Sequence, residues 1–120
     1  MPVKESLIAR IINLIPHGVT IVDSEGHVCL EYPSEGSARI VSSSEDSSAV
    51  NGIGISQCTF QRVEGLPEPQ EGILYLVSMP VAQICRARTD LICPDTGVTA
   101  LRSEDKKVIG VRGFVVYSGF

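Results

Sequence analysis

One histidine and one short segment carry the residue types that could perform acid–base or nucleophilic chemistry. His17, Ser78 and Asp90 could form a hydrolytic triad, and Cys85 with His17 could form a dyad. Ser78 has no flanking glycines of the kind that expose a serine on a nucleophile elbow. Asp90 lies two residues from Arg88, so an ion pair or a turn explains it without chemistry. The sequence therefore favours a protein that binds over an enzyme, and we assign no catalytic residue.

The same segment could instead hold an anion at the start of a helix. Pro80 follows Ser78 at the spacing of a first helical turn, where backbone N–H groups attract phosphate. Arginine side chains elsewhere in the chain could add bidentate contacts to such an anion, although each could equally pair with a surface carboxylate. The ligand-binding residues that we predict are Asn13, His17, Arg39, Ser78, Arg88, Asp90 and Arg112.

Length and charge limit the class of protein. A chain of 120 residues suits a single domain spanning 1–120. Its 10 basic and 14 acidic residues give a net charge of −4, which disfavours a nucleic-acid partner. The apolar run from Leu7 to Ile15 is too short to cross a bilayer, so we expect no membrane partner. We expect a cytoplasmic protein.

The four cysteines indicate neither a metal site nor a disulfide framework. None of them forms a C-x-x-C pair. Cys29, Cys58 and Cys85 lie in apolar stretches of sequence, so we expect buried free thiols in a reducing compartment. We expect no metal and no cofactor.

Short runs of β-branched and aromatic residues alternate with turn residues along most of the chain, which predicts strands. Ile73–Val77 is continuously apolar and should be the central strand, covered on both faces. A short helix should follow Ser78, which is available as its N-terminal cap, with Arg86 and Arg88 in its last turn. The other expected strands are 8–14, 19–22, 27–32, 38–42, 53–63, 98–102 and 108–112, and residues 113–117 should continue the last strand or bulge out of it. We expect two hairpins: 19–22 with 27–32 around the Asp23–Gly26 loop, and 98–102 with 108–112 around the Ser103–Lys107 loop.

Two polar segments should lie outside this scaffold. The serine-rich, acidic stretch at about 43–50 should be a mobile loop, and the proline-rich stretch Gly65–Gly72 a stiff connector. The fold class that we predict is α+β and mostly β: a small antiparallel sheet or partly open barrel with one short helix.

Several short motifs resemble a family of small uncharacterised proteins of tailed phages, prophages and bacteria. They are Asn13-Leu14-Ile15-Pro16-His17, Pro33-Ser34-Glu35-Gly36-Ser37-Ala38-Arg39, the stretch from Gly65 to Ser78, Arg88-Thr89-Asp90-Leu91 and Gly110-Val111-Arg112. Position 15 is Ile where the family usually shows Thr. The resemblance implies a phage or prophage context, and thus the host cytoplasm, without implying a reaction.

Three functional hypotheses remain open from the sequence. The first is a phage accessory protein that counters a host process by sequestering a nucleotide-derived anionic signal. The second is a protein–protein inhibitor or a small assembly subunit, with Gly113 to Phe120 as an interface strand and with homo-oligomers allowed. The third is a small hydrolase. A pocket requires the arginines to converge, whereas an interface requires exposed apolar residues such as Phe114, Tyr117 or Phe120.

Overall fold

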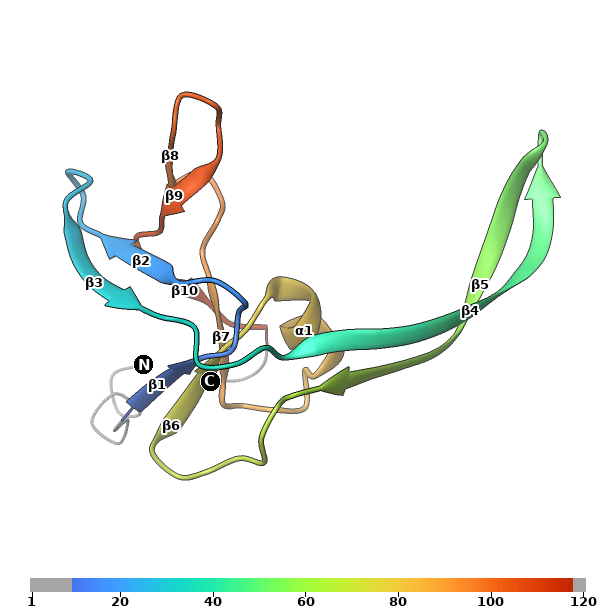
Figure 1. Ribbon diagram of the computed structural model, residues 1–120, viewed down its shortest axis with the longest axis horizontal. Coiled ribbons are helices and arrows are strands. Elements are labelled where there is room, and N and C mark those ends of the chain that lie inside the picture. Colours follow the sequence, from blue (N-terminus) through green and yellow to red (C-terminus); the bar gives the residue numbers. More distant parts are fainter. Residues whose placement is uncertain (1–9, 118–120) are drawn as a thin grey trace.

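The computed structural model describes residues 10–117, which form ten strands and one short helix (Figure 1). The elements of the first half are β1 (Arg10–Asn13), β2 (Val19–Val22), β3 (Val28–Tyr32), β4 (Arg39–Val50) and β5 (Ile53–Glu64). Those of the second half are β6 (Ile73–Leu76), α1 (Met79–Ile84), β7 (Leu91–Pro94), β8 (Leu101–Arg102), β9 (Val108–Gly110) and β10 (Phe114–Val115). The predicted class, α+β and mostly β with one short helix, is confirmed, and the sheets of the described residues do not close into a barrel.

The central sheet has the order β1-β6-β7-β10 and is mixed, not purely antiparallel as we expected. β6 pairs in parallel with both β1 and β7, and only β10 runs antiparallel to its neighbour. Parallel neighbours require a crossover connection. α1 provides it between β6 and β7, and the long excursion through β2 to β5 provides it between β1 and β6.

The central position of β6 is confirmed by its burial, because its side chains alternate between two apolar cores. Tyr75 and Val77 belong to a cluster that includes Val81 and Ala82 of α1. Leu74 and Leu76 belong to a second cluster, on the side of Val19 and the β2–β3 hairpin. Leu74 is 8% exposed and Leu76 0%, so both faces of the strand are covered.

The β2–β3 hairpin forms where the alternating residues and the Asp23–Gly26 loop predicted it. Its β2 edge is extended by the segment after β9, since the N–H of Val22 donates to the Val111 carbonyl at 2.8 Å and the N–H of Val111 donates to the Thr20 carbonyl at 2.9 Å. Gly110 permits this approach, because a Cβ there would lie 2.8 Å from Val22 Cγ1. The β8–β9 hairpin, shorter than predicted, projects beyond this layer (Figure 1).

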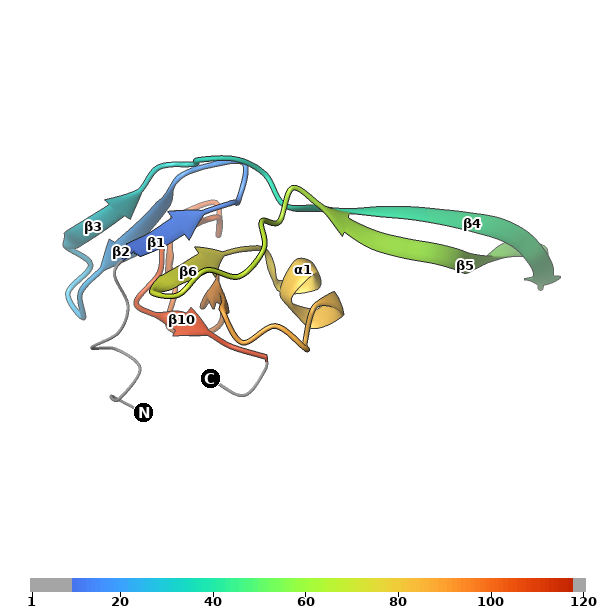
Figure 2. The same ribbon diagram turned by 90° about the horizontal axis from the view of Figure 1, so that it is seen from below.

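Our prediction of a mobile loop at 43–50 is wrong, because these residues form the outer part of β4. β4 and β5 pair in antiparallel register from Arg39↔Glu64 to Val50↔Ile53. The turn is Asn51-Gly52, whose positive φ values of 52° and 78° are those of a type I′ hairpin turn. We call this hairpin, residues 39–64, the arm; it extends away from all other elements (Figures 1 and 2). Serine and acidic residues are accommodated in a strand here because both of its faces are in solvent.

The base of the arm is fixed to the rest of the fold. Ile40, Val63 and Leu66 are partly buried against the cluster that contains Tyr75. Gly65 follows β5 with a φ of +82°, and a Cβ at this position would lie 2.2 Å from the Ser37 carbonyl oxygen. Only glycine allows the two chain segments to pass each other so closely.

The helix and the cysteines depart from prediction in their details. Ser78 precedes α1 but makes no side-chain capping bond, and α1 ends at Ile84, so Arg86 and Arg88 lie beyond the helix. Cys29 and Cys58 are exposed because they lie on a surface strand and on the arm, and Cys85 is only partly buried. Cys93 is buried, and burial raises the pKa of its thiol to about 11.

Candidate functional site

Two of the predicted site residues, Asn13 and His17, meet at the end of β1. The Asn13 side chain is fully buried and donates to the carbonyls of His17 at 3.0 Å and Tyr32 at 2.8 Å. Its oxygen accepts the N–H of Ile15 at 2.8 Å. Asn13 thus holds the 14–18 loop against β3 and uses its polar atoms within the fold. His17 is exposed, and its Nδ1 donates to the Gly18 carbonyl at 3.0 Å.

Arg88 and Asp90 are also brought together, in a bidentate ion pair. The guanidinium donates to both carboxylate oxygens, at 2.8 and 2.7 Å, and to the Pro67 carbonyl at 2.9 Å. Hydrogen bonds to Asp90 raise the pKa of Arg88 above its ordinary value. These contacts fasten the 65–72 connector to the segment between α1 and β7.

Arg39, Ser78 and Arg112 lie at three further places. Arg39 pairs with Glu64 at the base of the arm, 3.6 Å apart. Ser78 precedes α1. Arg112 donates to the carbonyls of Asp23 at 3.0 Å, Ser24 at 3.4 Å and Thr99 at 2.9 Å. The partners of Arg39, Arg88 and Arg112 share no residue, so each arginine is engaged in a different part of the fold.

A cavity of about 280 Å³ opens beside the end of β1, between β2, β7 and β9. Its lining is mostly apolar, with Val19, Pro94, Val108, Ile109 and Val111, and His17 stands in its wall. Small-molecule sites commonly occupy roughly 300–1,000 Å³. This cavity lies just below that range, and its size suits one or two apolar side chains better than a nucleotide. We call it the β9 cavity.

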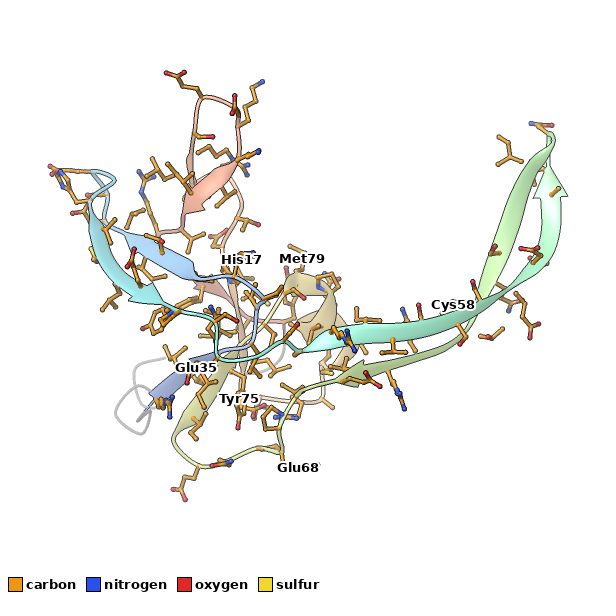
Figure 3. The ribbon with its side chains drawn as sticks, in the orientation of Figure 1. His17, Glu35, Cys58, Glu68, Tyr75 and Met79 are labelled. Carbon is orange, nitrogen blue, oxygen red and sulfur yellow. The ribbon has the colours of Figure 1, made fainter. Side chains whose placement is uncertain are left out.

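The outer arm is the most exposed structure in the described chain. Every residue from Ser42 to Thr59 is exposed. Figure 3 shows Cys58 on this part of the arm, far from His17 and Tyr75 in the body. An isolated two-stranded hairpin is only marginally stable in water, because no third strand or helix covers either face. Both faces of the outer arm are therefore open to contact with other molecules.

Three exposed aliphatic side chains lie at the turn end of the arm. Val50 is 55% exposed, Ile53 71% and Ile55 41%. Val50 and Ile53 are partners across the Asn51-Gly52 turn. We call Val50, Ile53 and Ile55 the arm tip. The sequence carries a signal for this hairpin, since Asn-Gly between β-branched residues strongly indicates a hairpin turn. We predicted a loop because the segment before Asn51 is rich in serine.

The charges of the arm and of the β8–β9 region are opposite. Glu45 and Asp46 are the only charged residues between Ser42 and Gln61. The segment from Arg102 to Arg112 carries four cationic side chains and two carboxylates. Arg102 donates to the carbonyls of Lys106 at 3.1 Å and Thr96 at 2.7 Å, so its charge faces backbone oxygens. Lys106 and Lys107 are exposed beside Val108, at the edge of the β9 cavity.

Other expected features of a site have more limited support. Phe114 and Tyr117 are half-buried, not fully exposed, and Phe120 lies outside the described residues. Tyr117 contacts the Arg86 guanidinium, which stands 5.9 Å from the ring centroid. Within residues 10–117, no group of three or more His, Cys, Asp or Glu could hold a metal ion. No helix in that range is long and apolar enough to cross a membrane.

Comparison of the chain with protein-family models, with curated proteins and with solved structures found no match in any of the three. We therefore infer a function from the arm, the β9 cavity and the charges around them.

Proposed function

We propose that this chain is a non-catalytic binding protein that holds a protein partner through its arm. The observation that carries the proposal is the complete exposure of residues 42–59, ending in the apolar arm tip. Long strands with free edges and exposed aliphatic side chains are the features by which proteins add strands or bury hairpins in one another.

The shape of the chain agrees with such a role. Its radius of gyration is 17.1 Å, whereas a compact domain of this length would have roughly 13.6 Å. It exposes 8003 Å², whereas a compact monomer of this mass would expose roughly 6,300 Å². Surface in such excess is what a subunit contributes to an assembly.

The resemblance to small phage and prophage proteins suggests the setting. In that setting, an arm-bearing chain is a small assembly subunit or an inhibitor that grips a host protein. The hypothesis of an anionic ligand stays a prediction. It has weaker support from the geometry, because Arg39, Arg88 and Arg112 are engaged with separate partners.

The test compares the full chain with a variant whose arm is shortened. Replacing residues 43–60 by Asn-Gly keeps the pair Ser42↔Gln61 and the buried Ile40 and Val63. We expect the full chain to bind a defined protein, itself or another, and the shortened variant to lose that binding while β6 and β7 keep their protection against hydrogen exchange. Equal binding by both chains would contradict the proposal.

The anionic-ligand alternative has its own measurement. A thermal-shift screen of the full chain against nucleotides and cyclic dinucleotides should give no shift if the arm is the binding element. A shift with one compound that persists in the shortened variant would favour a pocket in the body over the arm.

A further inference from the structure

We infer that the partner of the arm is a second copy of this chain, and that the arm tip of one copy enters the β9 cavity of the next. This inference rests on the proposed function and names its partner.

Shape and polarity match between the two surfaces. The arm tip presents Val50 and Ile53 side by side at the end of a narrow two-stranded rod. The β9 cavity, of about 280 Å³, is lined by aliphatic side chains, two of which, Val108 at 37% and Ile109 at 54%, are left exposed. Docking would remove both sets of aliphatic groups from water at once.

Charge selects this cavity over the neighbouring hollow. A second hollow, of about 420 Å³, lies across Gly18–Thr20 and contains Glu31 in its lining. The carboxylates Glu45 and Asp46 lie five and four residues before Val50 of the arm tip, roughly 13–17 Å along the strand. An arm in the β9 cavity would run beside the segment from Arg102 to Arg112, which carries four cationic side chains and two carboxylates, whereas an arm in the second hollow would approach Glu31. Opposite charges favour the first arrangement.

The area also agrees with a specific contact. The surface in excess of a compact monomer is roughly 1,700 Å² per chain. A standard interface takes roughly 800 Å² from each side. The excess reflects extended structure such as the arm, which is exposed from residue 42 to residue 59, and it is larger than the area that one side of such an interface needs.

The contact must join different copies. The arm leaves the body on the side away from the β8–β9 hairpin, so the tip cannot fold back into its own cavity (Figures 1 and 2). Tip and cavity are different surfaces, which makes the interface head-to-tail, and a head-to-tail interface closes into a ring or continues as a filament.

The test is a complementation experiment with two exposed substitutions. Ile53→Ser removes the arm tip and Ile109→Ser alters the cavity; both residues are more than half exposed, so each variant should fold, as checked by its unfolding midpoint. In sedimentation velocity over a wide range of concentrations, we expect the unmodified chain to self-associate. Each substitution should raise the dissociation constant at least about ten-fold.

Mixing provides the discriminating result. One variant keeps an intact tip and the other an intact cavity, so an equimolar mixture should form a heterodimer that stops at two chains. Leu30→Ser, on an exposed position of β3 at 55%, is the matched control and should associate like the unmodified chain. Mixtures that associate no better than the single variants, or a loss of association with Leu30→Ser alone, would overturn the inference.

Charge reversal gives an independent second route. Glu45→Lys with Asp46→Lys, or Lys106→Glu with Lys107→Glu, should each weaken association, and all four changes in one chain should restore it. If the unmodified chain stays monomeric while its arm still binds another protein, the inference fails and the proposed function stands. If the arm binds neither a second copy nor another protein, the inference and the proposed function both fail.

Discussion

Arg88 and Asp90, two residues apart in the sequence, face each other in a bidentate ion pair, with Nε–Oδ1 at 2.8 Å and Nη2–Oδ2 at 2.7 Å. The side chains are 21% and 13% exposed. The same guanidinium reaches the Pro67 carbonyl, so the pair joins the proline-rich connector to the start of β7. The pair therefore positions two segments of backbone relative to each other.

Arg88→Ala should lower the free energy of unfolding by about 1–3 kcal/mol, because it leaves a partly buried carboxylate and a carbonyl without their donor. Arg88→Lys should be more stable than Arg88→Ala and less stable than the unmodified chain, since an ammonium cannot make the paired contacts of a guanidinium. Urea unfolding measures both. Lys107→Ala, an exposed cation, is the control and should change stability by less than about 0.5 kcal/mol; an Arg88→Ala variant as stable as this control would mean that the pair contributes nothing.

Asn13→Ala should destabilise the fold by about 2–3 kcal/mol, because the part-buried carbonyls of His17 and Tyr32 and the buried N–H of Ile15 each lose a partner. Asn13→Asp should destabilise the fold more than Asn13→Ala, since it places a buried carboxylate against two carbonyl oxygens. Chemical denaturation gives both values. Gln83→Ala, which truncates an exposed amide on α1, should leave stability almost unchanged, and a similar small effect at Asn13 would refute its structural role.

The central strand could be predicted from sequence because its cause is local. Five consecutive apolar residues between turn signals require burial on both faces, and β6 is buried on both faces. The β2–β3 hairpin was equally local, since its turn and both its strands are adjacent in the sequence. These predictions needed only periodicity and turn chemistry.

The arm and the positions of the three arginines could not be predicted in this way. Ser42 to Ser48 has the composition of a loop, and its pairing with 55–61 depends on a turn several residues later. Whether Arg39, Arg88 and Arg112 converge depends on which elements the crossovers place together. That information lies in tertiary contacts such as Arg39 with Glu64, which no local pattern specifies.

Acid should loosen the β2–β3 turn. The Asp23 carboxylate accepts the N–H groups of His27 and Glu25, both at 2.9 Å, and the bond from His27 is the main reason that its pKa is lowered from 3.8. A pKa lower in the folded than in the unfolded chain means that this contribution to stability is present above about pH 4 and is lost as pH falls through the folded value.

An NMR titration of the Asp23 carboxyl should therefore give a midpoint below 3.8, and the His27 amide should lose protection over the same range. Asp23→Ala should weaken that protection at neutral pH and abolish its acid dependence. A midpoint at or above the ordinary aspartate value would show that the turn does not depend on the ionised carboxylate.

The base of the arm should be the position most sensitive to a single added methyl group. Gly65→Ala would place Cβ 2.2 Å from the backbone oxygen of Ser37, on a residue whose φ is +82°. Backbone atoms cannot rotate away as a side chain can, so we expect a loss of at least about 2 kcal/mol of unfolding free energy. Hydrogen exchange should locate the loosening at Ile40 and Val63, where the arm meets the core.

Gly54→Ala is the matched control within the same hairpin. A Cβ at Gly54 would meet nothing within 4 Å, and alanine restricts the unfolded chain more than glycine does, so the change should be neutral or stabilising by up to about 1 kcal/mol. Equal effects at the two glycines would mean that the arm is not held at its base by the close passage of Gly65 over Ser37. A loss of stability at Gly65 without a loss at Gly54 would show that the arm is anchored at its base and makes no such contact further out.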